Sequence, residues 1–307
     1  MTIFINFRKS NIKLIIDELN LQRSFTTNKN GEIDESIKFK NIDLWSPDNP
    51  KLYNVTVKIE GDEIVDQIGF REIKTKGKQI FLNGTPIKFK GISMHAEPIG
   101  EKGVAFSKAH FESLVTTSKE LNINFIRAAH YPYTRHMAKV CDELGIMLWE
   151  EIPVYWNINW TNRQTKEDAL NMLSNLVTRD WNRASVVVWS LGNETPFSKD
   201  RMTFMNDLKD RLGELDVSRL KSAAILSGDA QTFSKLISII AKVGLEKKDL
   251  TAKERYIFEE IIKNVPVPVE KLLPFEININ DPLANELDLI AYNEYFGWYY
   301  TSFFSAQ

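Results

Sequence analysis

The sequence predicts a small, incomplete β-sandwich over residues 1–78, followed by an incomplete (β/α)8 barrel over residues 79–307. A change of pattern supports this division. Up to residue 78, short stretches of alternating apolar and polar residues are bounded by turn formers, whereas from about residue 79 apolar, strand-like runs alternate with helical periods. Most of these later runs end in polar residues, which is typical of the barrel edge where active sites lie.

The composition describes a globular protein with no excess of charge. Of the 307 residues, 43% are hydrophobic and 26% charged, which leaves room for one large domain or two smaller ones. The formal net charge of −2 gives no attraction for polyanions, so we expect no nucleic-acid partner. A single cysteine, Cys141, excludes internal disulfides and multi-cysteine metal sites. No run of 18 apolar residues occurs, so we expect no membrane-spanning helix.

The first residues do not have the pattern of a targeting segment. Residues 1–14 contain three basic side chains but lack the apolar block of a signal peptide. Localisation is therefore left open: the protein is cytoplasmic if Met1 is the true start, and a secreted or periplasmic protein is not excluded.

The predicted sandwich depends on short strands and tight turns. Apolar and polar side chains alternate from Tyr53 to Ile59, and turn formers flank this stretch at residues 47–50 and 61–62. No long amphipathic helix interrupts residues 1–78. A small β-sandwich is the simplest interpretation.

Six apolar runs form the predicted strands of the barrel: residues 87–95, 123–130, 146–152, 186–194, 222–227 and 287–294. Helical periods separate them, with Ser107 and Thr134 as predicted N-caps and Gly145 as a left-handed C-terminal residue. A complete barrel needs eight units of about 31 residues, so about two units are expected to be missing at the C-terminus. Residues 228–286 exceed a usual crossover and are predicted to be an insertion. A doubly wound sheet is the alternative, but no glycine-rich turn supports it.

Polar residues close five of the six runs: His95, His130, Glu150 with Glu151, Asn193 with Glu194, and Asn293 with Glu294. Arg127 lies inside an apolar strand, where an unpaired guanidinium is costly. We therefore expect Arg127 to face the barrel mouth and to bond a carboxylate, which is Glu194, Glu150 or Glu151. A lone histidine is more often a structural residue, but His130 follows Arg127 at a strand tip, so we expect it to face a ligand.

Two of these segments, residues 124–132 and 180–194, resemble the signature motifs of glycoside hydrolase family 2, which includes β-galactosidases, β-glucuronidases and β-mannosidases. Further matches follow in the family's order at residues 44–53, 69–71, 82–84, 90–95 and 293–299. The resemblance leaves out the first forty residues and the insertion. It implies a hydrolase of O-glycosyl bonds with an immunoglobulin-like sandwich and a TIM barrel, of which this chain is a middle segment, truncated at both ends.

The resemblance also implies roles for individual residues. Glu194 falls on the general acid/base, and Asn193 falls on the asparagine that bonds the sugar 2-hydroxyl. The other substrate-site residues expected from the resemblance and from the strand tips are His95, His130, Tyr295, Arg127, Glu151 and Trp298, of which Tyr295 falls on the tyrosine that bonds the nucleophile. The family retains anomeric configuration, so a second carboxylate must act as nucleophile.

Several features depart from the family pattern. The family's nucleophile is a glutamate at the tip of the seventh strand, so we expect it outside this chain. Glu294 also lies at a strand tip, but it occupies a position that the family leaves variable, so we do not assign it as the nucleophile. Residues 152–157 lack the Glu and His metal ligands of bacterial β-galactosidases, so we expect no metal and no cofactor. This favours the β-glucuronidase-like branch. The aromatic residues Tyr155, Trp156 and Trp160 of the same loop are expected to pack rather than to stack on a sugar.

The sequence thus predicts a retaining exo-β-glycosidase whose partner is a carbohydrate β-glycoside. The sugar is left open between glucuronide, galactoside and mannoside, and so is homo-oligomerisation of the full-length enzyme. The alternative is a catalytically inactive fragment of such an enzyme that binds sugar weakly at most.

Overall fold

The computed structural model describes residues 10–33, 35–226, 241–242, 244–246, 249–264 and 281–293. The N-terminal part is a four-stranded antiparallel sheet in the order β2–β1–β3–β4. Its elements are β1 (Asn11–Ile16), the 3-10 turn η1 (Asp17–Leu19), β2 (Leu21–Thr26), β3 (Tyr53–Ile59) and β4 (Asp62–Ile68). Alternate side chains such as Leu14 and Val55 are buried on one face, against partly buried Ile37 and Phe39. This sandwich-like region fits the predicted β-sandwich.

A small three-stranded sheet follows, built from β5 (Ile73–Lys76), β6 (Gln79–Leu82) and β7 (Thr85–Ile87). Asn83 and Gly84 form the β6–β7 turn with φ of 53° and 79°, which a two-residue hairpin requires. Ile73 and Leu82 are buried in the same cluster as Trp149 of the main sheet. The small sheet therefore closes the N-terminal end of the barrel interior. The predicted domain boundary at residue 78 lies in the β5–β6 turn.

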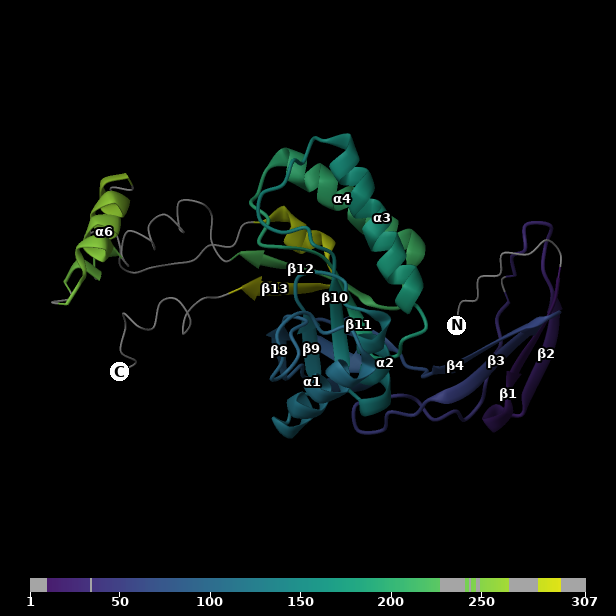
Figure 1. Ribbon diagram of the computed structural model, residues 1–307. Helices are drawn as coiled ribbons and strands as arrows, with labels where there is room; N and C mark the ends of the chain where they lie inside the picture. The colour runs from purple at the N-terminus through teal and green to yellow at the C-terminus, as the bar shows by residue number, and fades with distance from the viewer. Residues whose placement is uncertain are drawn as a thin grey trace.

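The main sheet consists of six parallel strands in the order β13–β12–β11–β10–β9–β8, so each strand lies beside its neighbour in sequence (Figure 1). The strands are β8 (Gly91–Met94), β9 (Phe125–Ala128), β10 (Met147–Glu151), β11 (Val186–Asn193), β12 (Leu220–Leu226) and β13 (Leu289–Asn293). The connecting helices are α1 (Lys108–Glu120), α2 (Arg135–Leu144), α3 (Arg163–Asp180) and α4 (Lys199–Leu215). This arrangement confirms the predicted partial (β/α)8 barrel. Part of the β12–β13 connection, the predicted insertion, is described as α6 (Ala252–Asn264) and η3 (Pro282–Glu286).

The first predicted barrel strand, residues 87–95, is divided in the structure. Residue 87 ends β7, and the parallel strand begins only at Gly91. The Asn124 side chain accepts a hydrogen bond from Lys90 N–H at 2.8 Å and donates one to the Lys88 carbonyl at 3.0 Å. A side chain thus satisfies the backbone between the two strands, which allows the chain to pass from one sheet to the other.

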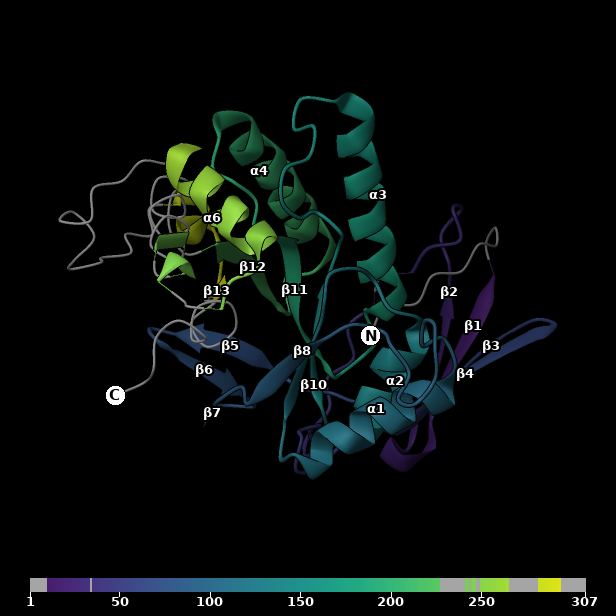
Figure 2. The ribbon, with the colours of Figure 1, turned by 60° about the vertical axis from the view of Figure 1, so that its left-hand side comes forward.

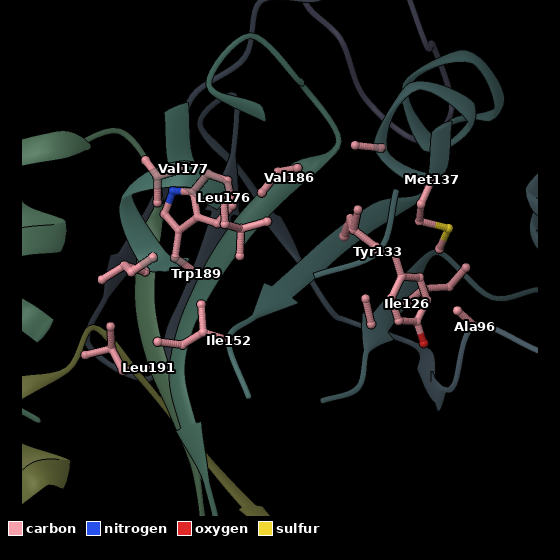
Figure 3. Close-up of a cluster of buried hydrophobic side chains, with 14 of the residues drawn as sticks. Ala96, Ile126, Tyr133, Met137, Ile152, Leu176, Val177, Val186, Trp189 and Leu191 are labelled. Carbon is pink, nitrogen blue, oxygen red and sulfur yellow. The ribbon is translucent and has the colours of Figure 1, made fainter. Parts of the chain in front are cut away.

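Both faces of the central strands β9, β10 and β11 are buried. The outer face packs on the helices α1–α4, in a cluster that includes Ile126, Val177 and Trp189 (Figures 2 and 3). The inner face carries Phe125, Met147 and Trp149. Side chains alternate along a strand. In β10, residues 147, 149 and 151 therefore face the barrel interior, whereas residues 148 and 150 face the helices.

Candidate active site

Arg127 lies at the centre of a polar cluster at the carboxyl end of the sheet. It projects from β9 to the inner face, where Nε and Nη2 donate to the two oxygens of Glu151 at 3.1 and 3.2 Å. Nη2 also donates to Asn193 Oδ1 at 2.7 Å. Of the three carboxylates considered from the sequence, Glu151 is the one that bonds Arg127. The guanidinium joins β9 to β10 and β11 through a planar set of donors that suits a carboxylate.

Glu151 is completely buried and surrounded by nitrogen donors. Trp149 Nε1 donates to Oε2 at 2.8 Å, and His130 Nδ1 lies 2.5 Å from Oε1. Together with Arg127, these groups engage both carboxylate oxygens. Because both are engaged, Glu151 is suited to orienting Arg127 and His130.

Glu150 lies on the opposite face of β10 and takes no part in this cluster. Its carboxyl is buried between the sheet and α3, with Oε1 3.5 Å from Arg179 Nη2. Burial and the nearby Asp180 raise the pKa of Glu150 well above its usual value. The alternation of side chains along β10 thus separates the two neighbouring glutamates.

The Asn193–Glu194 pair ends β11 at the same edge, and both residues are buried. Glu194 has φ of 52°, in the left-handed region that non-glycine residues rarely adopt, and its N–H donates to the Ala224 carbonyl at 2.8 Å. Its Oε1 accepts from Asn293 Nδ2 at 2.7 Å, and its Oε2 accepts from Trp156 Nε1 at 3.1 Å. The turn and these two donors fix the direction of the carboxyl group.

The two predicted histidines lie together. The His95 and His130 rings meet edge to face with centroids 5.7 Å apart. Tyr131 stacks on His95 at 6.1 Å, and Tyr155 lies 6.1 Å from His130. His95 is exposed and His130 half-buried, so these rings border the open side of the cluster.

Asn293, the last residue of β13, was not among the predicted site residues. Its Oδ1 accepts from Arg127 Nη1 at 3.2 Å, and its Nδ2 donates to Asn193 Oδ1 at 2.8 Å as well as to Glu194. Its place at the end of an apolar run was the available sequence signal. Trp149 and Trp156 are two further contacts that the sequence did not indicate.

Three residues discussed from the sequence, Glu294, Tyr295 and Trp298, lie outside the described residues. Among those that are described, no three His, Cys, Asp or Glu side chains gather closely enough to hold a metal ion. The described helices also include none with the length and apolar character needed to cross a membrane.

Comparisons with known proteins agree with this architecture. The family model described as "Glycosyl hydrolases family 2, TIM barrel domain" matches residues 73–251, and the model "Glycosyl hydrolases family 2" matches residues 7–71. A putative beta-glucuronidase from Formosa agariphila is 32% identical over 237 residues, which cover 70% of this chain and 28% of that protein. A beta-galactosidase from Thermoanaerobacterium thermosulfurigenes is 34% identical over 186 residues, covering 59% of this chain and 25% of that protein.

Solved structures show the same relationship. The beta-glucuronidase of Parabacteroides merdae, crystallised with glycerol in its active site, superposes with a TM-score of 0.64 and 27% identity, over 71% of this chain and 30% of that one. The chain thus spans about a quarter to a third of the length of these relatives. The match of the barrel model to more than half of the residues confirms the resemblance found in the sequence, and the chain belongs to glycosyl hydrolases family 2.

Proposed function

We propose that this chain carries the acid/base and sugar-binding part of a retaining exo-β-glycosidase that hydrolyses terminal β-glucuronides or β-galactosides. The observation that carries the proposal is the position of the Glu194 carboxyl, which two N–H donors hold beside Asn193 and Arg127 at the carboxyl end of the parallel sheet. Relatives with both printed names support the two candidate sugars.

In the proposed mechanism, Glu194 protonates the leaving oxygen in the first step and takes a proton from water in the second. A retaining route needs a nucleophilic carboxylate about 5–5.5 Å away. Glu151 does not suit that role because it is completely buried and each of its two oxygens lies against two nitrogen groups, from Arg127, His130 and Trp149. We assign the nucleophile to a residue outside the described part of the chain.

Asn193 is proposed to bond the sugar 2-hydroxyl. Its Oδ1 accepts from both Arg127 and Asn293, which orients the amide so that Nδ2 is its remaining donor. Among the described residues, no hydrogen bond of this nitrogen is seen. An amide donor held in this way can strengthen its bond to the 2-hydroxyl as the oxocarbenium-like transition state forms. His95 and His130 are proposed to contact the same sugar, and no metal is assigned.

Replacing Glu194 tests the proposal directly. Aryl β-glucuronides and β-galactosides are offered to the full-length protein, its Glu194→Gln variant and the control Glu112→Gln, which changes a carboxyl on α1. General acid catalysis contributes about 10²- to 10⁴-fold, so Glu194→Gln should lose activity on that scale while the control keeps it. Equal turnover by wild type and Glu194→Gln would remove Glu194 from the mechanism.

An inactive, weakly sugar-binding chain is a second candidate. It is favoured by the open sheet, since among the described residues β8 and β13 are each paired on one side only. Melting and turnover measurements on residues 1–307 alone distinguish the two: cooperative unfolding together with turnover would exclude this candidate.

A further inference from the structure

Trp156 combines an exposed ring with an anchored N–H group. Its side chain is exposed (64%), as is that of Tyr155 (40%), so these two rings do not pack inward as the sequence suggested. Trp160 of the same loop does pack, edge to face on Phe204 at 5.3 Å, and its N–H bonds Asn157. The indole N–H of Trp156 instead donates to Glu194 Oε2 at 3.1 Å.

The backbone holds the Trp156 loop against the end of β11. The backbone N–H of Asn193 donates to the Val154 carbonyl at 2.9 Å, and the backbone N–H of Trp156 donates to the Asn193 carbonyl at 3.0 Å. Trp156 itself has φ of 56°, a left-handed conformation that these flanking bonds stabilise. The indole is thus presented to Glu194 by a paired segment of backbone.

The indole N–H suits a carboxyl that must serve as acid and then as base. It is a donor only and it is neutral, so it can bond an unprotonated oxygen lone pair in both steps of the reaction. Asn293 holds the other oxygen in the same manner. Two fixed donors keep the plane of the Glu194 carboxyl constant while its proton leaves and returns.

The two oxygens of Glu194 face different surroundings. Oε1 lies on the side of Asn293, which also bonds Arg127 and Asn193 in the interior cluster. Oε2 lies on the side of the exposed Trp156. In an exo-acting enzyme the terminal sugar occupies the interior and the leaving group points outward, so Trp156 stands where the leaving group must pass.

We propose that Trp156 is a positioning residue for Glu194 and that its exposed ring is the platform on which the leaving group stacks. The leaving groups that fit are aromatic rings and sugars, because both offer a flat face with apolar C–H or π surface to an indole. This inference rests on the proposed function, since it assigns the leaving-group side of that same site.

The test separates the N–H group from the ring. Trp156→Phe keeps an aromatic face but removes the donor, Trp156→Ala removes both, and Trp160→Phe is the matched control. The full-length protein is assayed on 2,4-dinitrophenyl, phenyl and methyl β-glycosides of whichever sugar, glucuronic acid or galactose, the wild type hydrolyses faster. Melting curves check folding, and the 64% exposure of Trp156 leads us to expect little change.

Loss of positioning should depend on the leaving group. With phenyl and methyl glycosides, which need protonation, Trp156→Phe should lower kcat/KM about tenfold, the effect of losing one hydrogen bond to an ionisable group. With the 2,4-dinitrophenyl glycoside, which leaves without an acid, kcat/KM should stay within about twofold. Relative to Trp156→Phe, Trp156→Ala should raise KM about fivefold for the phenyl glycoside but not for the methyl glycoside.

The outcomes separate this inference from the proposed function. If Glu194→Gln abolishes turnover while Trp156→Phe lowers all three substrates equally, or behaves like Trp160→Phe, the positioning role is refuted and the proposed function stands. Equal KM for Trp156→Ala and Trp156→Phe refutes the platform. If the wild type hydrolyses neither sugar, or Glu194→Gln remains active, the proposed function fails and this inference fails with it.

Discussion

Replacing Arg127 by methionine should destabilise the barrel strongly, because the change leaves the buried Glu151 carboxylate without its cation. The Arg127 side chain is 13% exposed and that of Glu151 is 0% exposed, and two guanidinium N–H groups bond the carboxylate. Methionine retains most of the aliphatic volume. The effect of Arg127→Met therefore reports mainly the lost charge and hydrogen bonds.

The magnitude follows from the burial of the pair. Removing one partner of a buried ion pair lowers the free energy of unfolding by about 3–5 kcal/mol. With a melting temperature that shifts by about 2–4 °C per kcal/mol, Arg127→Met should melt roughly 6–20 °C below wild type. Replacing both partners, as in Arg127→Met/Glu151→Leu, removes the stranded charge but leaves the Trp149 indole N–H without its acceptor, at roughly 1–3 kcal/mol. The double variant should therefore be more stable than Arg127→Met.

The assay is thermal unfolding of the wild type, Arg127→Met and the double variant, beside the control Arg163→Met. Arg163 pairs with Glu167 on the surface of α3, with its side chain 89% exposed, and such an exposed pair contributes little to stability. Comparable melting temperatures for Arg127→Met and Arg163→Met would refute the reasoning. So would a double variant that is less stable than Arg127→Met, because the two partners would then not be coupled through the buried charge.

Two further changes test a close backbone contact at Gly145 and the buried carboxyl group of Glu150. Gly145→Ala places a Cβ 2.5 Å from the Pro47 carbonyl oxygen at φ of 72°, so it should lower the free energy of unfolding by about 2 kcal/mol or more. The control Gly84→Ala, at φ of 79° with open space around the Cβ, bears only the backbone strain, and equal melting temperatures of the two variants would contradict the close contact. Because the pKa of Glu150 is raised from 4.5 by burial and by Asp180, the folded state holds a proton that the unfolded state releases, and stability falls as pH rises above about 4.5. Glu150→Gln should remove that loss, so its melting temperature should gain on wild type between pH 5 and pH 8; parallel curves would count against a raised pKa.

The strand order was predictable from the sequence because it depends on local patterns. Each parallel strand from β8 to β12 is followed by a helix and pairs with the next strand along the chain, so alternation of strands and helices predicted both the sheet and the edge that carries the polar residues. The division of residues 87–95 was not predictable in this way. It depends on the Asn124 side chain, which lies 34 residues away from Lys90 in sequence.

The partner of Arg127 illustrates why the site was predicted only in part. A parallel strand buried on both faces has apolar residues at every position, so the run Met147–Leu148–Trp149 does not indicate which neighbour of the pair Glu150–Glu151 faces inward. The register settles it, because Trp149 lies opposite Arg127 and both side chains point to the same face. Residue 151 then follows residue 149 inward, a result that needs the three-dimensional pairing of β9 with β10.

The same reasoning applies to the donors that hold Glu194. Asn293 is 99 residues away and Trp156 is 38 residues away, on opposite sides of β11 in the sheet order. Neither contact has a local pattern, since each arises only when strand ends are brought to one edge. The carboxyl of the proposed acid/base is thus oriented jointly by the end of β13 and by the loop after β10. A substitution that displaces either segment should therefore reduce proton transfer by Glu194, even where Asn193, Arg127 and Glu151 keep their own hydrogen bonds.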